Sequence, residues 1–384
     1  MLKRFIVFLL IAIFSIGIFA TTTINVWFSW EGQKEFQTLV DQFNTSQSLY
    51  HVNLVYIPSM TQKLQITLSS GNQLPDLALI QSGYDMGFLV NANVLTPVGT
   101  VNTSKAFYNS FLTNGKLYAY PYYADVQVIY LNRKIYKGPL PSDNWNLSDF
   151  ETLANKIKED GHIGAVLNNT SSYFFNSFYA AFNEGVIPQE NGIPIVNNDG
   201  TIKAAEFYNK IFNVDKIAVS FTKAALINSF TSGKTGMLFQ GSFLIPDFLN
   251  LGLDFTILPY PYFDNGQPIQ PDFDAKGFAI FKNSEAVRAF LDYITSAKNE
   301  VYFCASTYKL PANLEAMHEL DNSNQFFRIM DLSGQKGLIL PTTNVFQTAY
   351  SDAISTALQL YLSGQMSVDE ALSKAQNYID SQAK

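Results

Sequence analysis

Apolar and polar positions alternate along the chain, first with the two-residue period of strands and then with the longer period of helices. Ile24, Val26 and Phe28 interleave with more polar neighbours, which predicts a short strand. Residues 52–57 are predicted as a second strand and residues 77–80 as a third, fully buried one. Strands that alternate with helices indicate an α/β protein whose sheets are covered on both faces.

The helices are predicted from apolar positions three and four residues apart. Four residues form such a face in the first helix: Phe36, Leu39, Val40 and Phe43. Two later helices open with a Ser–Glu capping box, Ser148 with Glu151 and Ser367 with Glu370. Together with these two, the later helices are predicted at residues 148–158, 203–212, 285–297, 350–362 and 368–379.

The first twenty residues form a segment of their own. Lys3 and Arg4 precede an apolar run over residues 5–18, and Ala20 comes just before a threonine triplet. This order is typical of a cleaved secretory signal peptide, and the run is short for a membrane span of about 20 residues. We therefore expect export to the periplasm. Because no cysteine lies at the cleavage point, we expect no lipid anchor.

Charge and cysteine content narrow the function classes. The chain has 25 Lys and Arg against 32 Asp and Glu; removing Lys3 and Arg4 with the leader leaves 23 against 32, a net charge of −9. Such a chain repels polyanions, so nucleic acid is not an expected partner. The single Cys304 cannot form an internal disulfide.

Length predicts two domains, because about 360 residues exceed what one core covers. The Pro- and Gly-containing loops are short, and none is long enough for a flexible linker. We therefore expect strands of a sheet to connect the two domains. Such a connection allows hinge motion but no free movement of one domain relative to the other.

Motifs of catalysis and metal binding are mostly absent. Gly233-Lys234-Thr235 resembles the end of a phosphate-binding loop, but Asn228 occupies the position of its first glycine. The three histidines are scattered singly, so no zinc site is predicted. Tyr122-Tyr123 lacks the further ligands of a ferric site. A carboxylate pair for glycoside hydrolysis stays open, because sequence does not show separations. We expect no cofactor and no metal.

Aromatic residues placed near polar ones are the main candidate chemistry. Their flat rings suit the C–H faces of sugars, while neighbouring Asp, Glu and Gln suit the hydroxyls. Several follow predicted strands, where ligands of α/β sheets bind. These groups are Trp30 with Glu31, Tyr84 with Asp85, Tyr122 with Asp125, Tyr173 with Phe174 and Phe175, and Phe239 with Gln240.

The chain resembles the extracellular solute-binding proteins of carbohydrate ABC importers, of the maltose- and glycerol-3-phosphate-binding kind. The resemblance rests on about ten short motifs in the family's order, each weak alone. Among them are Ser70-Gly71-Asn72-Gln73-Leu74-Pro75-Asp76, Val128-Ile129-Tyr130-Leu131-Asn132, Phe230-Thr231-Ser232-Gly233-Lys234-Thr235-Gly236-Met237 with Gly241-Ser242, and Lys276-Gly277-Phe278.

This resemblance implies a two-lobed periplasmic-binding-protein fold with discontinuous lobes and a hinge. The chain would cross between lobes near Asp125, near Ala275 and near Leu332. After a signal peptide at 1–20, the N-terminal lobe would comprise 21–125 plus 276–331. The C-terminal lobe would comprise 126–275 plus 332–384.

The resemblance also implies a carrier and not an enzyme, with a small-molecule carbohydrate and the importer's permease subunits as partners. We expect a monomer that captures a neutral di- or oligosaccharide. Glycerol-3-phosphate or a glycerophosphodiester is the alternative, weakened because Lys309 stands where that branch has Tyr and no Arg follows Leu340-Pro341. An exported glycan-active enzyme is a more distant alternative. The expected ligand-binding residues are Trp30, Glu31, Tyr84, Asp85, Tyr122, Asp125, Tyr173, Phe239, Gly241, Ser242, Gly277 and Lys309.

Overall fold

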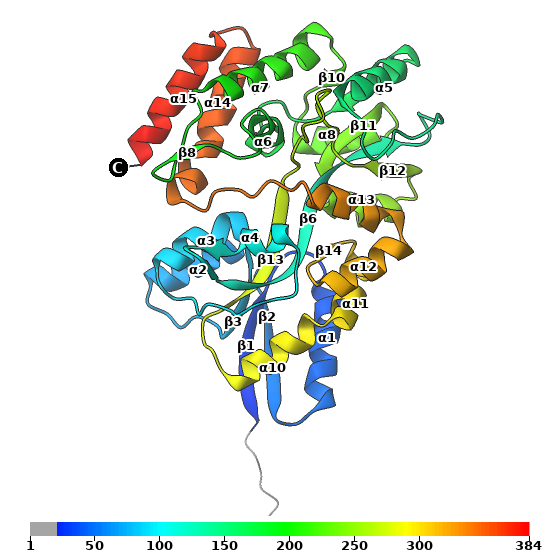
Figure 1. Cartoon of the computed structure of the whole chain (residues 1–384). Coiled ribbons are helices and arrows are strands. Elements are labelled where there is room, and N and C mark those ends of the chain that lie inside the picture. Colours follow the sequence, from blue (N-terminus) through cyan, green and yellow to red (C-terminus); the bar gives the residue numbers. More distant parts are fainter. Residues whose placement is uncertain (1–20, 384) are drawn as a thin grey trace, which may run out of the picture.

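The computed structural model describes residues 21–383, so the leader predicted at 1–20 lies outside the described residues. Two lobes, at the bottom and top of Figure 1, share one mixed sheet covered by helices. The strand order is β10–β7–β11–β6–β13–β3–β1–β2, with β12 and β14 pairing to β6. The α/β class predicted from the alternating pattern is confirmed.

The lower lobe begins with three parallel strands, in which β1 lies between β2 and β3. The strands are β1 (Thr22–Phe28), β2 (Tyr50–Tyr56) and β3 (Leu77–Gln81). The helices are α1 (Gln33–Ser46), α2 (Met60–Ser69), α3 (Ser82–Asn91), α4 (Lys105–Ser110), α10 (Glu285–Ile294), α11 (Ala297–Thr307) and α12 (Leu314–Ser323). The apolar face predicted for the first helix is buried, which confirms both its period and its orientation.

The upper lobe contains the other half of the sheet. Its strands are β7 (Ile163–Val166), β10 (Ala218–Val219), β11 (Thr235–Gly241) and β12 (Phe255–Leu258). Its helices are α5 (Leu147–Glu159), α6 (Ser172–Ala181), α7 (Asp199–Asn209), α8 (Lys223–Thr231), α9 (Ile245–Asn250), α14 (Ser351–Leu362) and α15 (Val368–Gln382). Short elements complete the described chain: β4 (Leu112–Thr113), β5 (Lys116–Leu117), β8 (Gln189–Glu190), β9 (Ile193–Pro194), β14 (Leu310–Pro311), and the turns η1 (Lys210–Val214), η2 (Ser242–Leu244) and η3 (Phe346–Tyr350).

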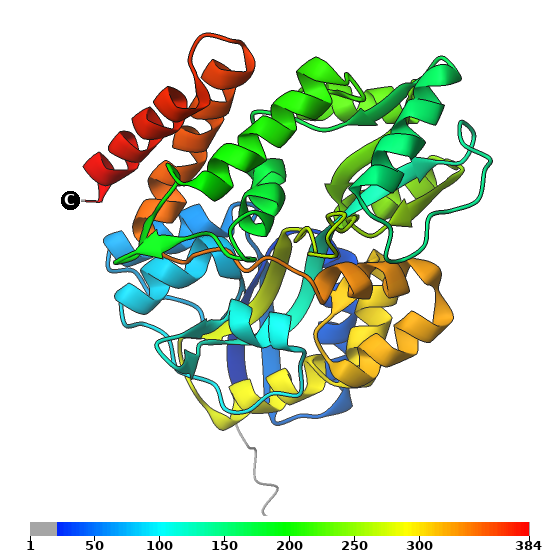
Figure 2. The same cartoon turned by 45° about the horizontal axis from the view of Figure 1, so that its top comes forward.

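One long strand connects the lobes. The first half of β6 (Ala119–Asn132) pairs with β13 (Phe273–Ile280), and its second half pairs with β11 and β12. The change of partner falls between Val126, opposite Phe273, and Gln127, opposite Gly241. After α13 (Gln325–Gly334), the segment 335–345 passes across these strands towards η3, as both Figure 1 and Figure 2 show in orange. The exact lobe boundaries given above stay predictions.

Two helix boundaries differ from the sequence-based ones for local reasons. The capping box of α5 is Asn146 with Asp149, two residues before the predicted pair, because the Asn146 side chain accepts the Asp149 N–H. The Ser148 hydroxyl instead donates to Asp264. The helix predicted over 285–297 ends at Ile294, and a new helix begins at Ala297. The second predicted capping box, which opens α15, is confirmed.

Candidate ligand-binding cleft

A cavity of about 580 Å³ lies between the two lobes. The lower lobe contributes the loop after β1 and residues of α1 and α11, while the upper lobe contributes α8, η2 and α9. The crossing strands β6 and β13 contribute its floor. The lower wall contains Trp30, Glu31, Gly32, Glu35, Ser306 and Thr307. The floor and upper wall contain Asp125, Asp274, Lys276, Lys309, Lys223, Phe243, Leu244, Pro246 and Asp247.

Trp30 is held at the mouth of this cavity by an unusual backbone. Its φ is 65°, in the left-handed region that bulky residues rarely adopt. The Lys276 Nζ lies 5.7 Å from the centre of the Trp30 ring. Strained backbone of this kind is concentrated at functional sites, because the surrounding structure must hold it in place. The side chain therefore has the position and rigidity of a ligand platform.

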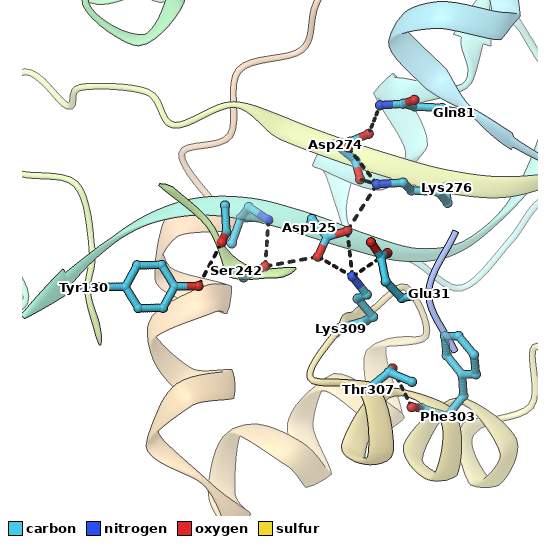
Figure 3. A network of polar contacts seen from close by, with 12 residues as sticks. Glu31, Gln81, Asp125, Tyr130, Ser242, Asp274, Lys276, Phe303, Thr307 and Lys309 are labelled. Atoms are coloured by element: carbon cyan, nitrogen blue, oxygen red, sulfur yellow. Dashed lines mark hydrogen bonds and ion pairs between the residues drawn. The ribbon is translucent and has the colours of Figure 1, made fainter. Parts of the chain in front are cut away.

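The floor is a buried network of charges, shown in Figure 3. The Lys309 Nζ lies 2.8 and 3.0 Å from the two Asp125 oxygens and 3.2 Å from Glu31 Oε2. The Lys276 Nζ lies 3.2 Å from Asp125 Oδ2 and 2.7 Å from Asp274 Oδ2. Each lysine thus bridges two carboxylates, so neither ammonium is left without a counter-charge.

The protonation states follow from this arrangement. Burial by itself would raise the pKa of Asp125, but Lys309 and Lys276 together bring it below its ordinary value. Burial by itself would lower the pKa of Lys276, yet Asp274 and Asp125 raise it well above its ordinary value. The pKa shifts of Asp125 and Lys276 thus favour the charged form of both groups, and their opposite charges stabilise each other.

A second chamber of about 340 Å³ adjoins this cavity, since Lys223 and Phe243 line both. Four of its nine lining residues are aromatic, and it is called the aromatic chamber below. Tyr84 at the start of α3 comes from the lower lobe, and Tyr173 at the start of α6 comes from the upper lobe. Rings from both lobes thus face the same volume, with the polar ends of Asn168 and Gln240 among them.

Half of the expected ligand-binding residues line these two volumes. Trp30, Glu31, Asp125 and Lys309 belong to the larger cavity, and Tyr84 and Tyr173 to the aromatic chamber. Ser242 lies directly beneath: its hydroxyl donates to Asp125 at 3.4 Å and accepts the Val126 N–H at 3.1 Å. It positions the carboxylate without lining the cavity.

Two expected rings are placed in the core instead, each because of the two-residue period of its strand. Tyr122 is fully buried against Phe303, whereas the next residue, Tyr123, lies under the two floor lysines. Phe239 packs on Phe150 and Tyr260, whereas Gln240 faces the aromatic chamber. In the second pair, the residue that lines the cleft is one position further along the strand.

Three other expected residues have structural surroundings. Asp85 accepts hydrogen bonds from Thr61 at 2.6 Å and from the Gln81 N–H at 2.8 Å, and burial raises its pKa to about 6. A side chain at Gly277 would come within 2.7 Å of the Tyr120 carbonyl oxygen, so this position serves sheet packing. Gly241 lines neither volume, but a side chain there would collide with Phe243 and come within 2.9 Å of the Tyr173 hydroxyl.

Sequence reasoning missed several lining residues. Asp274 alternates with Lys276 along β13, so their shared face was visible once the strand was known. Phe243 comes just after β11, and Lys223 opens α8. These two positions follow sheet strands at the side where ligands bind, which is the signal that singled out the other candidates.

Among residues 21–383, no three His, Cys, Asp or Glu side chains are arranged to hold a metal ion. Within the same range no helix has the length and apolar character needed to span a membrane.

Comparison with known proteins decides the family. The model of the bacterial extracellular solute-binding protein family matches residues 29–301. The chain belongs to this family. A maltooligosaccharide ABC transporter solute-binding lipoprotein of Streptococcus pneumoniae is 24% identical over 284 residues, 68% of this chain and 65% of the relative. A galactooligosaccharide-binding protein of Bacillus subtilis is 22% identical over 260 residues, 62% of this chain and 60% of the relative.

The matched part of the chain thus spans less than two thirds of the length of these curated relatives. The fold extends further than the sequence similarity. A cyclo/maltodextrin-binding protein complexed with maltotetraose superposes with a TM-score of 0.83 at 18% identity, covering 95% of this chain and 98% of that chain. This likeness establishes the two-lobed fold predicted from the sequence.

Proposed function

We propose that this solute-binding protein captures a neutral oligosaccharide between its lobes and delivers it to the membrane subunits of an ABC importer. The observation that carries the proposal is the cleft itself. Rings from both lobes line two adjoining volumes, and the buried lysines Lys276 and Lys309 of the floor are each paired with carboxylates. Such a surface stacks on sugar rings and bonds hydroxyls without attracting a charged ligand.

The cleft dimensions support an oligosaccharide. The two adjoining volumes of about 580 and 340 Å³ are in the range of sites for drug-sized ligands. The names of the two relatives support the same class of ligand, since one is a maltooligosaccharide-binding and the other a galactooligosaccharide-binding protein. The protein would act as a monomeric carrier without turnover, exported by a cleaved leader and free of a lipid anchor.

A phosphorylated ligand fits the floor less well. Lys309 and Lys276 are each committed to two carboxylates, and Glu35 and Asp247 add further negative charge to the same cavity. Lys223 is the remaining lining cation among the described residues. A phosphate dianion would have to bind through Lys223 alone or displace existing ion pairs, and such displacement costs desolvation and Coulomb energy.

The test is a thermal-shift screen over neutral oligosaccharides, monosaccharides, polyols and glycerol phosphates, followed by calorimetry on each ligand that raises Tm. Binding to the folded state raises stability by RT ln(1 + [L]/Kd). Saturable binding of a neutral oligosaccharide, recovered unaltered, is the expected result. Selective binding of glycerol-3-phosphate would overturn the proposal, and chemical conversion of the sugar would replace the carrier by an enzyme.

A further inference from the structure

A small chamber lies at the far end of the cleft floor, where both lobes and two crossing segments meet. It has a volume of about 60 Å³. Tyr84 reaches it from α3 of the lower lobe, and Tyr173 and Asn176 reach it from α6 of the upper lobe. Asp272, just before β13, and Leu340, on the segment after α13, complete it. Because Tyr84 and Tyr173 also line the 340 Å³ aromatic chamber, the small chamber lies directly behind that volume.

Asp272 is the unusual group in this chamber. It is 7% exposed, and its Oδ1 has no hydrogen-bond partner among residues 21–383. A buried acceptor without a partner is costly, so such atoms call for an explanation by function. The main chain of Asp272 is fixed: its N–H donates to Gln127 Oε1 at 2.9 Å, and its carbonyl accepts the Gln127 N–H at 3.1 Å. Asp272 therefore lines the chamber from a main chain that is fixed in place.

The groups around Asp272 determine its charge. Burial, followed by the nearby Asp274, raises the pKa of Asp272 to about 8, and Lys276 only partly opposes them. The phenols that face it, Tyr84, Tyr173 and Tyr260, have pKa values raised by burial, that of Tyr84 to about 12. The Tyr350 phenol, which reaches the chamber from η3, has its pKa raised by burial as well. Near neutral pH, Asp272 is a neutral carboxyl group that offers both a donor and an acceptor.

The size of the chamber restricts which chemical groups can bind in it. A water molecule occupies about 30 Å³ in the liquid, so the chamber is too small for a sugar ring and large enough for one exocyclic group. A hydroxymethyl group has this size, and its hydroxyl both donates and accepts, as a protonated carboxyl does. The ring that carries it would sit between Tyr84 and Tyr173 in the adjoining chamber.

We propose that Asp272 binds a hydroxymethyl group of the captured sugar behind Tyr84 and Tyr173, and that sugar binding weakens when this carboxyl group ionises. The proposal rests on the proposed sugar capture. An ionised carboxylate no longer donates, and it retains water that the sugar would have to displace. The protein would accordingly prefer oligosaccharides of hexoses, which carry hydroxymethyl groups, over matched pentose oligosaccharides, which lack them.

The experiment measures Kd by calorimetry between pH 6.5 and pH 9.5 for the oligosaccharide that binds best. We expect the wild-type Kd to be constant below about pH 8 and to rise above it, by at most about tenfold for each pH unit. Asp272→Asn should abolish this rise, because an amide also donates and accepts and does not titrate here. Asp274→Asn should move the rise to lower pH. It removes the negative charge that raises the pKa of Asp272, and it frees the positive charge of Lys276, which lowers that pKa. Asp254→Asn, at an exposed surface pair, is the matched control and should behave as wild type.

Each outcome decides a separate point. Lys336 also has a pKa lowered to about 8 by burial, so a rise that persists in Asp272→Asn would assign the effect to Lys336 and overturn the proposal. A 6-deoxy analogue of the terminal sugar should bind about tenfold more weakly to wild type, the size expected of one lost hydrogen bond. Equal affinity for that analogue would also overturn it. Sugar binding that is independent of pH refutes only the proposed role of Asp272. The absence of sugar binding at any pH refutes the proposed function as well.

Discussion

Asp125 lies on β6 and Asp272 directly precedes β13, the two strands that join the lobes, and both carboxyl groups are almost completely buried. Asp125 is surrounded by Lys309, Lys276 and the Ser242 hydroxyl, so it is stabilised as an anion. Burial and the nearby Asp274 disfavour the negative charge of Asp272, and Lys276 only partly opposes them, so Asp272 is stabilised in the neutral form. One floor thus holds an ionised and a protonated carboxyl group.

These two environments of a buried carboxyl group have the same consequence for a ligand. At one end of the cleft the carboxylates are compensated by lysines, and at the other end the carboxyl group carries no charge. The cleft floor is rich in acidic residues and still presents little net charge, which suits a neutral sugar. The two residues therefore have different roles. Asp125 maintains the structure of the floor, and Asp272 remains available to bind the ligand.

The largest expected effect separates the two residues by stability. Asp125→Asn removes the shared partner of two buried lysines, and breaking such a network costs about 3–5 kcal/mol of unfolding free energy. Asp272→Asn should not lower stability at pH 7 and should instead raise it, because ionisation of Asp272 in the unfolded state already disfavours the folded wild type at this pH. Urea denaturation monitored by circular dichroism measures both, with the exposed Asp254→Asn as control. Equal losses for the two variants would remove the distinction between them.

The next effect concerns the rings at the two ends of the cleft. Trp30→Ala in the larger cavity and Tyr84→Ala in the aromatic chamber should each weaken sugar binding by about 1–3 kcal/mol. Tyr84 is 51% exposed, so its loss should leave the stability nearly unchanged. The matched control is Phe239→Ala, a buried ring outside the cleft, which should cost about 3–5 kcal/mol of stability. Calorimetry and denaturation on the same variants would contradict the assignment if Tyr84→Ala bound normally.

An effect that accumulates over several pH units should have opposite signs at the two carboxyl groups. The pKa of Asp125 is lowered in the folded state, so its stabilisation is complete above the unfolded value near 4 and is lost as pH falls through the folded value. The pKa of Asp272 is raised to about 8, so its contribution is greatest below about 4 and declines as pH rises to 8. Relative to Asp272→Asn, the wild type should therefore lose at most about 1.4 kcal/mol for each pH unit in that window. Stability curves of both proteins from pH 4 to 9 test this, and parallel curves would contradict it.

The smallest expected effect is that of salt. Because the floor lysines are compensated and Asp272 is neutral, sugar affinity should change less than twofold between low salt and about 0.5 M salt. Glycerol-3-phosphate, by contrast, would bind through Lys223 or by displacing Asp125, and salt would weaken that binding strongly. Titrations of both ligands at two ionic strengths distinguish the cases. Tight, salt-sensitive phosphate binding that is lost in Lys223→Met would show that the floor is not electrically neutral to ligands.

Much of the fold was accessible from the sequence, because periodicity reports burial directly. The apolar face of α1, the buried β3 and the capping box of α15 were all predicted at their observed places. The break between α10 and α11 was not, since residues 295 and 296 interrupt the helix without a proline or glycine. Position along the chain also singled out Trp30, Asp125 and Tyr173, because each follows or lies within an element that reaches the cleft.

The limits at the cleft have a definite physical cause. In a strand, neighbouring side chains face opposite sides, so an error of one residue exchanges the core for the ligand site, as with Tyr122 and Phe239. The pairing of Lys309 with Asp125 joins residues 184 positions apart, and no local pattern encodes such a contact. In the sequence, Asp272 only alternates with Asp274, a spacing that by itself indicates no site. The lack of a hydrogen-bond partner for Asp272 Oδ1 becomes apparent only when three other segments pack around this residue.

The interrupted course of the lobes affects how the chain can fold. The strand that completes the lower half of the sheet, β13, pairs with β3 and β6, whose residues precede it by about 150 to 200 positions, as the 151 positions between Asp125 and Lys276 illustrate. The first strands and helices can form early, but the central place in their sheet stays open until β13 arrives. Such non-local pairing slows folding, because a long loop must close before the contacts that stabilise it exist. A chain of this topology therefore remains incompletely folded until most of its length is present.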